Sequence, residues 1–157
     1  MKEIFDKKKK VGWREVKGLV LLDTCFIIDC VMKNKKIKIN NAGITSFNAE
    51  ELIHVEKRLK GKRAMRNFLR NTDFVLVEVP VSPGYWMQEK EFVESVNHGL
   101  LKNIADASDA VLMAAAIQTK SDVLTKDKHH LFTTKLENFL YDYGIRVYKE
   151  LKDVQNT

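Results

Sequence analysis

Residues 19–30 read LVLLDTCFIIDC, and this stretch decides the fold because a charged residue interrupts two apolar runs. The run 19–22 is typical of a short strand that is buried on both faces of a sheet. Asp23 follows this run directly, and the residues after it can continue as a helix. A carboxylate in such a place must be paired, hydrogen-bonded or metal-bound, because burying it bare costs several kcal/mol.

The composition is that of one compact globular domain. The chain has 157 residues, of which 45% are hydrophobic and 31% charged, with only two prolines and seven glycines. No apolar run is long enough to span a membrane, and no apolar segment follows the first residues, so we expect a cytoplasmic protein without a secretory signal. Cys25 and Cys30 are the only cysteines, and we expect both to be reduced core residues.

The charge balance favours a polyanionic partner. The chain carries 27 Lys and Arg against 21 Asp and Glu, which leaves a net charge of +6. The lysine run 7–10 is either a solvated tail or an arm that contacts nucleic acid. We expect a basic N-terminal extension over residues 1–18, one domain over 19–150 and a C-terminal tail over 151–157.

Strand and helix patterns alternate along the chain. Short apolar or β-branched runs predict strands at 19–22, 74–79, 123–125 and 145–148. Apolar residues at helical spacing predict helices at 26–32, 45–59, 64–70, 85–96, 109–117 and 136–143. This alternation predicts a three-layer α/β/α domain with a central, mostly parallel, twisted sheet. Binding sites in such sheets form beyond the carboxyl ends of the strands.

Four acidic residues stand out by position: Asp23, Glu51, Asp109 and Asp127. Each has a structural explanation of its own. Asp23 can cap the following helix, and Asp127 can be a turn residue. Glu51 can close a capping box with Asn48, and Asp109 can favour the dipole of a helix capped by Asp106 or Ser108.

Taken together, the four acids favour a metal site. Two follow predicted strands and two begin predicted helices, so an α/β layout allows them to converge. Clustered carboxylates repel one another unless cations neutralise them, and hard oxygen ligands suit Mg²⁺ or Mn²⁺. Such ions activate water and stabilise charge on a scissile phosphate. An acidic metal pocket in a basic protein is therefore typical of a nuclease.

Four short motifs, in this order, resemble those of the PIN-domain ribonucleases, and among them the VapC-like toxins. The motifs are LLDT at 21–24, TSFNAEEL at 45–52, DAVLMAAA at 109–116 and VLTKD at 123–127. The resemblance covers about residues 19–148.

This resemblance implies a PIN-like fold and an endoribonuclease whose catalytic metal ligands are Asp23, Glu51, Asp109 and Asp127. Mg²⁺ or Mn²⁺ would be the cofactor and RNA the substrate. Thr24 and Thr125 match hydroxyl positions that support the site. A toxin of this family would pair with an antitoxin protein, whereas a related archaeal or bacterial PIN nuclease would work without one. The resemblance also implies a homodimer, for which Trp86 and Phe92 offer apolar surface.

Other candidates are open at this point. Glu50 competes with Glu51 for the helix position, and Asp106 competes with Asp109. Three histidines and three aromatic residues are further candidates for contacts with metal, substrate or RNA bases: His54, His129, His130, Trp13, Tyr85 and Trp86. The densest basic patch is equally compatible with an RNA-contacting face and a solvated one: Arg58, Lys60, Lys62, Arg63, Arg66 and Arg70.

Two other functions compete with the nuclease. A catalytically silent PIN-fold module would bind RNA, or act as a scaffold, through its basic face alone. A phosphoryl-transfer receiver or phosphatase shares the α/β pattern. It would need paired acids around the first strand, whereas residues 23–25 read DTC.

Overall fold

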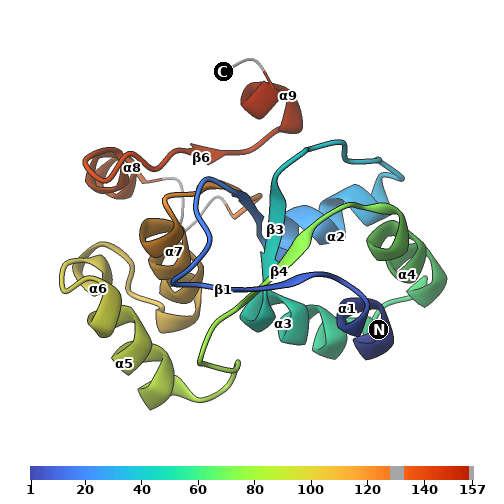
Figure 1. The fold of residues 1–157 in the computed structure, drawn as a ribbon, viewed down its shortest axis with the longest axis horizontal. Coiled ribbons are helices and arrows are strands. Elements are labelled where there is room, and N and C mark those ends of the chain that lie inside the picture. Colours follow the sequence, from blue (N-terminus) through green and yellow to red (C-terminus); the bar gives the residue numbers. More distant parts are fainter. Residues whose placement is uncertain (128–132, 156–157) are drawn as a thin grey trace.

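The central sheet is parallel throughout the part of the chain that the structure describes. The computed structural model describes residues 1–127 and 133–155, and the strands within them form one six-stranded sheet in the order β1-β4-β3-β2-β5-β6 (Figure 1). Every pairing between these described strands is parallel. The strands are β1 (Lys10–Gly12), β2 (Val20–Leu22), β3 (Ala42–Thr45), β4 (Val75–Glu78), β5 (Asp122–Leu124) and β6 (Val147–Tyr148). The predicted α/β fold class is confirmed.

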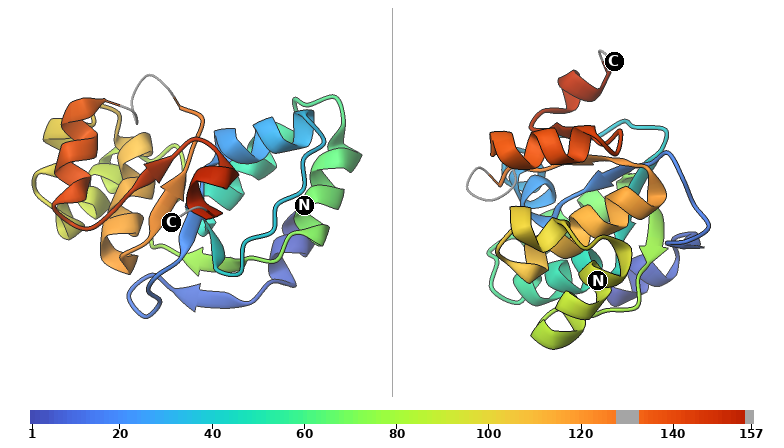
Figure 2. Two further views of the ribbon diagram at one scale, coloured as in Figure 1. Left: turned by 90° about the horizontal axis from the view of Figure 1, so that it is seen from above. Right: turned by 90° about the vertical axis from the view of Figure 1, so that its left-hand side faces the viewer.

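Helices cover both faces of this sheet (Figures 1 and 2). One face packs against α1, α2 and α4, the other against α5, α6, α7 and α8, and α3 contributes side chains to both cores. The helices are α1 (Lys2–Asp6), α2 (Thr24–Met32), α3 (Ser46–Glu56), α4 (Lys62–Asn71), α5 (Trp86–Val96), α6 (Leu100–Asn103), α7 (Ala107–Thr119), α8 (Thr134–Tyr141) and α9 (Leu151–Gln155). The arrangement is the expected three-layer α/β/α sandwich.

Strand residues alternate between the two cores, as the pleat of a strand requires. Leu21 points into the core beside α5 and α7, and its neighbour Leu22 points into the core beside α2 and α4. Val123 and Leu124 of the adjacent β5 divide in the same way. The continuous apolar run after residue 18 therefore serves both layers.

The N-terminal residues, expected as an extension, contribute to the layers. Strand β1 is an edge strand that pairs with β4. Phe5 of α1 is buried and packs edge to face on Phe74, with ring centroids 6.1 Å apart. Lys8 donates a hydrogen bond to the carbonyl of Thr72 (2.8 Å), and its ammonium lies 4.6 Å from the centre of the Phe74 ring. The lysine run is therefore anchored at Lys8 and Lys10 rather than trailing as a tail.

The order of the strands creates a switch point between β2 and β5. These two strands lie side by side in the sheet. The chain leaves β2 through α2 towards β3 on one side, and it leaves β5 through α8 towards β6 on the other. Connections that diverge in this way leave a crevice at the carboxyl ends of the two strands. Asp23 and Asp127 both follow these ends.

No helix in the described residues is long and apolar enough to cross a membrane. Both cysteines are free thiols, with Cys30 buried in the core beside α2.

The contacts of α1 predict that the N-terminal segment stabilises the whole domain. Phe5→Ala should lower the free energy of unfolding by ~3–5 kcal/mol, because it empties a buried aromatic site against Phe74. Urea denaturation followed by circular dichroism measures this change. Met32→Ala, at a side chain that is 78% exposed, serves as the control and should change stability little. A loss for Phe5→Ala as small as that of the control would contradict the packing of α1.

Candidate functional site

The four predicted acids line one cavity at the carboxyl edge of the sheet. The cavity has a volume of about 460 Å³, and its wall includes Asp23, Glu51, Asp109 and Asp127. Asp23 follows β2 and Asp127 lies beyond β5, whereas Glu51 lies midway along α3 and Asp109 lies in the first turn of α7. Helix α3 follows a strand and α7 precedes one, so both run antiparallel to the sheet and begin at its carboxyl edge. The topology therefore brings all four carboxylates together.

Asp23 is held by three donors, two from the first turn of α2 and one from the residue that follows β5. It is the N-cap of α2, and its Oδ1 accepts a hydrogen bond from the backbone N–H of Thr24 at 2.7 Å. Its Oδ2 accepts from the hydroxyl of Thr125 at 2.7 Å and from the thiol of Cys25 at 3.3 Å. Burial raises the pKa of Asp23, the hydrogen bonds oppose this shift, and the nearby charge of Asp127 adds to it. Asp23 therefore both caps α2 and lines the cavity.

Asn48 joins Asp23 to Glu51. Its side-chain N–H₂ lies within hydrogen-bond distance of Asp23 Oδ1 (3.4 Å), Thr24 Oγ1 (3.1 Å) and Glu51 Oε1 (3.0 Å). The Asn48 carbonyl oxygen accepts from the hydroxyl of Thr45 at 2.6 Å, which fixes which end of the amide faces the cavity. This role of Asn48 was not expected from the sequence, although Asn48 stands one helical turn before Glu51 on the same face of α3.

The alternative in which Glu51 closes a capping box with Asn48 is wrong. Thr45 is the N-cap of α3, and its hydroxyl accepts the backbone N–H of Asn48 at 3.0 Å. The helix therefore begins three residues earlier than that box requires. Glu51 falls in the second turn, where its side chain points into the cavity instead of back to a cap.

Glu51 carries the clearest sign of electrostatic crowding. Its Oε1 accepts a hydrogen bond from the Thr24 hydroxyl at 3.1 Å. Burial, together with the charges of Asp23 and Asp109, raises the pKa of Glu51 to about 7. The carboxylates thus lie close enough to oppose one another's ionisation, and a cation among them would relieve this repulsion.

Asp109 enters the cavity from the first turn of α7. Asp106 is the N-cap of this helix and accepts the backbone N–H groups of Ser108 (2.8 Å) and Asp109 (3.4 Å). Asp106 thus serves the helix end, while Asp109 lines the cavity. Ser108 also lines the cavity, and its hydroxyl donates to Glu89 at 2.8 Å. Glu89 of α5 is buried and is a fifth acid near the site, which the sequence did not single out.

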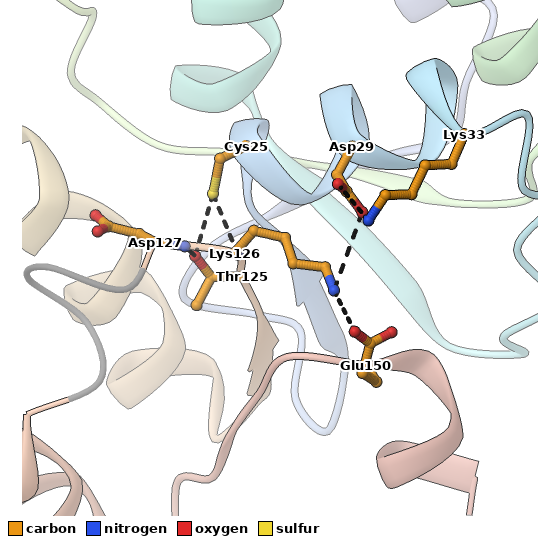
Figure 3. A network of polar contacts seen from close by, with 7 residues as sticks. All are labelled: Cys25, Asp29, Lys33, Thr125, Lys126, Asp127 and Glu150. Carbon is orange, nitrogen blue, oxygen red and sulfur yellow. Dashed lines mark hydrogen bonds and ion pairs between the residues drawn. The ribbon is translucent and has the colours of Figure 1, made fainter.

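Asp127 and Lys126 turn in opposite directions after β5 (Figure 3). The backbone N–H of Asp127 donates to Thr125 Oγ1 at 3.1 Å, which places this acid on the cavity wall. The ammonium of Lys126 lies 2.6 Å from Glu150 Oε1 and 4.0 Å from Asp29 Oδ2. The hydrogen bond from Lys126 lowers the pKa of Glu150. This ion pair ties the segment before α9 to the end of β5.

Cys25 is a second residue that sequence reasoning missed. Its sulfur lies 3.3 Å from the Thr125 hydroxyl and accepts the backbone N–H of Lys126 at 3.3 Å (Figure 3). Burial and the charge of Asp23 raise the pKa of the Cys25 thiol to about 11. The thiol therefore stays protonated and links β5 to α2 as a neutral hydrogen-bonding group.

The remaining candidates lie elsewhere. Glu50 accepts a hydrogen bond from Ser82 at 3.1 Å and does not line the cavity, which distinguishes it from Glu51. His54 is exposed near the C-terminal end of α3, and His129 and His130 lie outside the described residues. Trp86 and Tyr85 are exposed.

Phe92 is not available as apolar surface for a dimer. It is buried and packs edge to face on the half-buried Trp13, with ring centroids 5.0 Å apart. Of the two residues predicted to offer apolar surface, only Trp86 is exposed. The ammonium of Lys90 lies 3.5 Å from the centre of the Trp86 ring.

The donor set of the cavity suits a hard divalent cation. Four carboxylates, the hydroxyl of Thr24 and the side chain of Asn48 line it, and Mg²⁺ or Mn²⁺ prefers oxygen ligands of this kind. Within residues 1–127 and 133–155, no three His, Cys, Asp or Glu side chains are already gathered so that they could hold a metal ion. Asp23 and Glu51 are connected through Asn48, and Asp109 and Asp127 complete the wall. The chemistry of the wall thus fits the ion, and its side chains would have to draw closer around it.

Comparison with known proteins identified no relative: no family model, no curated protein and no solved structure matches the chain.

The raised pKa of Glu51 predicts an unusual dependence of stability on pH. The pKa of Glu51 rises from 4.5 to about 7 on folding, so the folded protein holds this proton more tightly than the unfolded chain. With a chelator present, the free energy of unfolding should therefore fall as the pH rises from 4.5 to about 7 and then level off. Glu51→Gln should reduce this slope, because its side chain does not titrate. Urea denaturation at a series of pH values measures the slope.

Glu91→Gln, at an exposed position on α5, is the matched control and should keep the wild-type slope. Equal slopes for Glu51→Gln and Glu91→Gln would show that Glu51 is not crowded by the other acids.

Proposed function

We propose that this protein is a divalent-metal-dependent endoribonuclease, and that the acidic cavity between β2 and β5 is its active site. The observation that carries the proposal is the convergence of Asp23, Glu51, Asp109 and Asp127 on one cavity. These residues come from four separate places in the sequence. Individual helix caps and turns explain single acids, but they do not explain why all four line the same wall.

The chain's own residues prepare the cavity for a phosphodiester. Asp23 is oriented by Thr125, Thr24 and Cys25, so its carboxylate has little freedom to rotate. Asn48 holds Glu51 beside it. A bound Mg²⁺ or Mn²⁺ would supply an activated water and stabilise the negative charge that develops on the phosphate. The hydrogen bonds to Asp23 and Glu51 would limit the movement of these two acids while the wall closes around the ion, which favours catalysis because less reorganisation is needed.

RNA is the substrate class best supported by charge and by motif. The surplus of Lys and Arg favours a polyanion, and the four ordered motifs resemble those of the PIN-domain ribonucleases. A PIN-like nuclease, whether a toxin with an antitoxin partner or an RNA-processing enzyme, is the proposal that follows from this resemblance. Action in the cytoplasm and assembly as a homodimer belong to the same proposal. The competing function is a silent module that binds RNA without cutting it.

Cleavage assays test the proposal directly. The purified protein should cut single-stranded RNA with Mg²⁺ or Mn²⁺ and lose this activity in excess EDTA. Asp23→Asn and Asp109→Asn should each lower the cleavage rate by at least about 100-fold, the scale expected when one charged group of a preorganised site is lost. Rates are read from the products on denaturing gels.

Asp142→Asn is the matched control, because it makes the same chemical change at an exposed acid that ends α8. It should cut at the wild-type rate. Cleavage that survives both EDTA and Asp23→Asn would overturn the proposal. RNA binding without any cleavage would support the silent module instead.

A further inference from the structure

A groove continues from the acidic cavity along the exposed side of α2. Ile28 lines the cavity and also a second hollow of about 320 Å³, which lies between α2 and the turn before α4. Val31 and Ala64 line this second hollow and also a third one of about 680 Å³. We call these two hollows, which share their walls, the α2–α4 groove. It leads from the candidate active site past the C-terminal end of α2.

The second wall of the groove comes from distant parts of the chain. Residues 34–38 follow α2 and face the side of α4, where Phe68 and Asn71 lie. Figures 1 and 2 show this segment passing alongside α4. From Thr24 to Met32, α2 rises ~12 Å, so the groove adds the length of a few nucleotides to the cavity.

The acidic cavity and the α2–α4 groove carry opposite charges. The cavity is lined by four acids and by one lysine, Lys126, which is paired with Glu150. Among the described residues, the α2–α4 groove is lined by lysines and by no acid: Lys35, Lys36, Lys38 and Lys60. Segments 33–38 and 57–72, which supply these lysines, hold eleven of the 27 Lys and Arg residues and no Asp or Glu. The rest of the chain therefore has 16 basic against 21 acidic residues. The whole positive surplus of the protein belongs to this region.

Some of the charges in these two segments are already paired with acids. Lys33 lies 3.0 Å from Asp29, and Arg66 lies 2.6 Å from the buried Glu56. Lys35, Lys36 and Lys60 are exposed. Their ammonium groups can therefore turn to a ligand at little cost in lost contacts.

The floor of the groove is apolar. Met32, which is 78% exposed, lies beside Ile28 and Val31, and Phe68 lies further along. A double helix shields the faces of its bases, whereas a single strand can lay them on apolar and aromatic side chains while its phosphates meet lysines. A lysine rim around an apolar floor therefore fits a single strand better than a duplex.

We propose that the α2–α4 groove binds the part of a single-stranded RNA that extends beyond the cleavage site. This inference deepens the proposed function and rests on it for the chemistry at the acidic end. The lysines contact the phosphates, and the apolar floor contacts the bases. The strand thereby reaches the acidic cavity from the basic region, which offsets the repulsion between phosphates and carboxylates.

Binding measurements with neutralised lysines test the groove. The test variant is Lys35→Gln/Lys36→Gln/Lys60→Gln, and the control is Lys17→Gln/Lys102→Gln/Lys120→Gln, which removes the same charge at exposed positions elsewhere. Both are made with Asp23→Asn, so that RNA stays intact. Fluorescence anisotropy with a ~12-nucleotide single strand, between about 50 and 200 mM salt, gives affinity and its salt dependence.

The groove variant should bind at least about tenfold more weakly than the control, and its slope of log K against log salt should be shallower by about 2, because three phosphate contacts are lost. The same RNA as a duplex should bind the unmodified groove more weakly than the single strand. Thermal unfolding of both variants should match that of the parent, since the changed side chains are exposed.

Equal affinities for the groove and control variants would overturn the inference and leave the groove for another partner, such as a protein segment. Duplex binding as tight as single-strand binding would overturn it as well. If the groove lysines contribute to RNA binding but the wild type does not cleave RNA, the binding groove is supported and the proposed nuclease activity is contradicted. If the wild type cleaves RNA but the groove lysines do not contribute to binding, the nuclease activity is supported and the binding groove is contradicted.

Discussion

The site depends on the burial of one carboxylate, that of Asp23, at the end of β2. A buried carboxylate is tolerated only where donors surround it. Here the donors are a helix N-terminus, a hydroxyl and a thiol, and Thr125 brings the hydroxyl from the neighbouring β5. The same contact holds β2, β5 and α2 in one arrangement at the switch point of the sheet. A change that removes these donors would destabilise the fold and also disrupt the site.

The opposed charges of the protein follow from where its elements begin and end. The acids lie at the carboxyl edge of the sheet, where strands end and antiparallel helices start, so the parallel topology gathers them. Eleven of the 27 basic residues, and no acid, lie in the segments 33–38 and 57–72, which follow α2 and α3 at their far ends. Although the net charge is +6, the charge is unevenly distributed, with an acidic cavity next to a strongly basic region. This separation is what a phosphodiester substrate and its metal would each require.

Several elements escaped sequence analysis for physical reasons. Strand β3 contains Ala42 and Gly43, which have little intrinsic preference for strands. A Cβ on Gly43 would lie 3.0 Å from Leu19 Cδ1 and 3.1 Å from Leu21 Cδ2, so glycine is present because β2 packs closely there. Edge strand β1 is short and begins with a lysine, and only its pairing with β4 reveals it. Such strands are decided by their neighbours.

The sequence by itself determined the α/β class, the long amphipathic and apolar helices, and the four acids as a group, since hydrophobic periodicity and the order of motifs are local properties. Only the tertiary structure decided that Glu51 and not Glu50 lines the cavity, that Asn48 connects the acids, and that Cys25 supports Asp23. These facts depend on where α3 begins and on which side chains β5 presents to β2. Contacts between residues about a hundred positions apart, such as Thr125 with Asp23, leave no periodic trace in the chain, because they arise only when the strands pair.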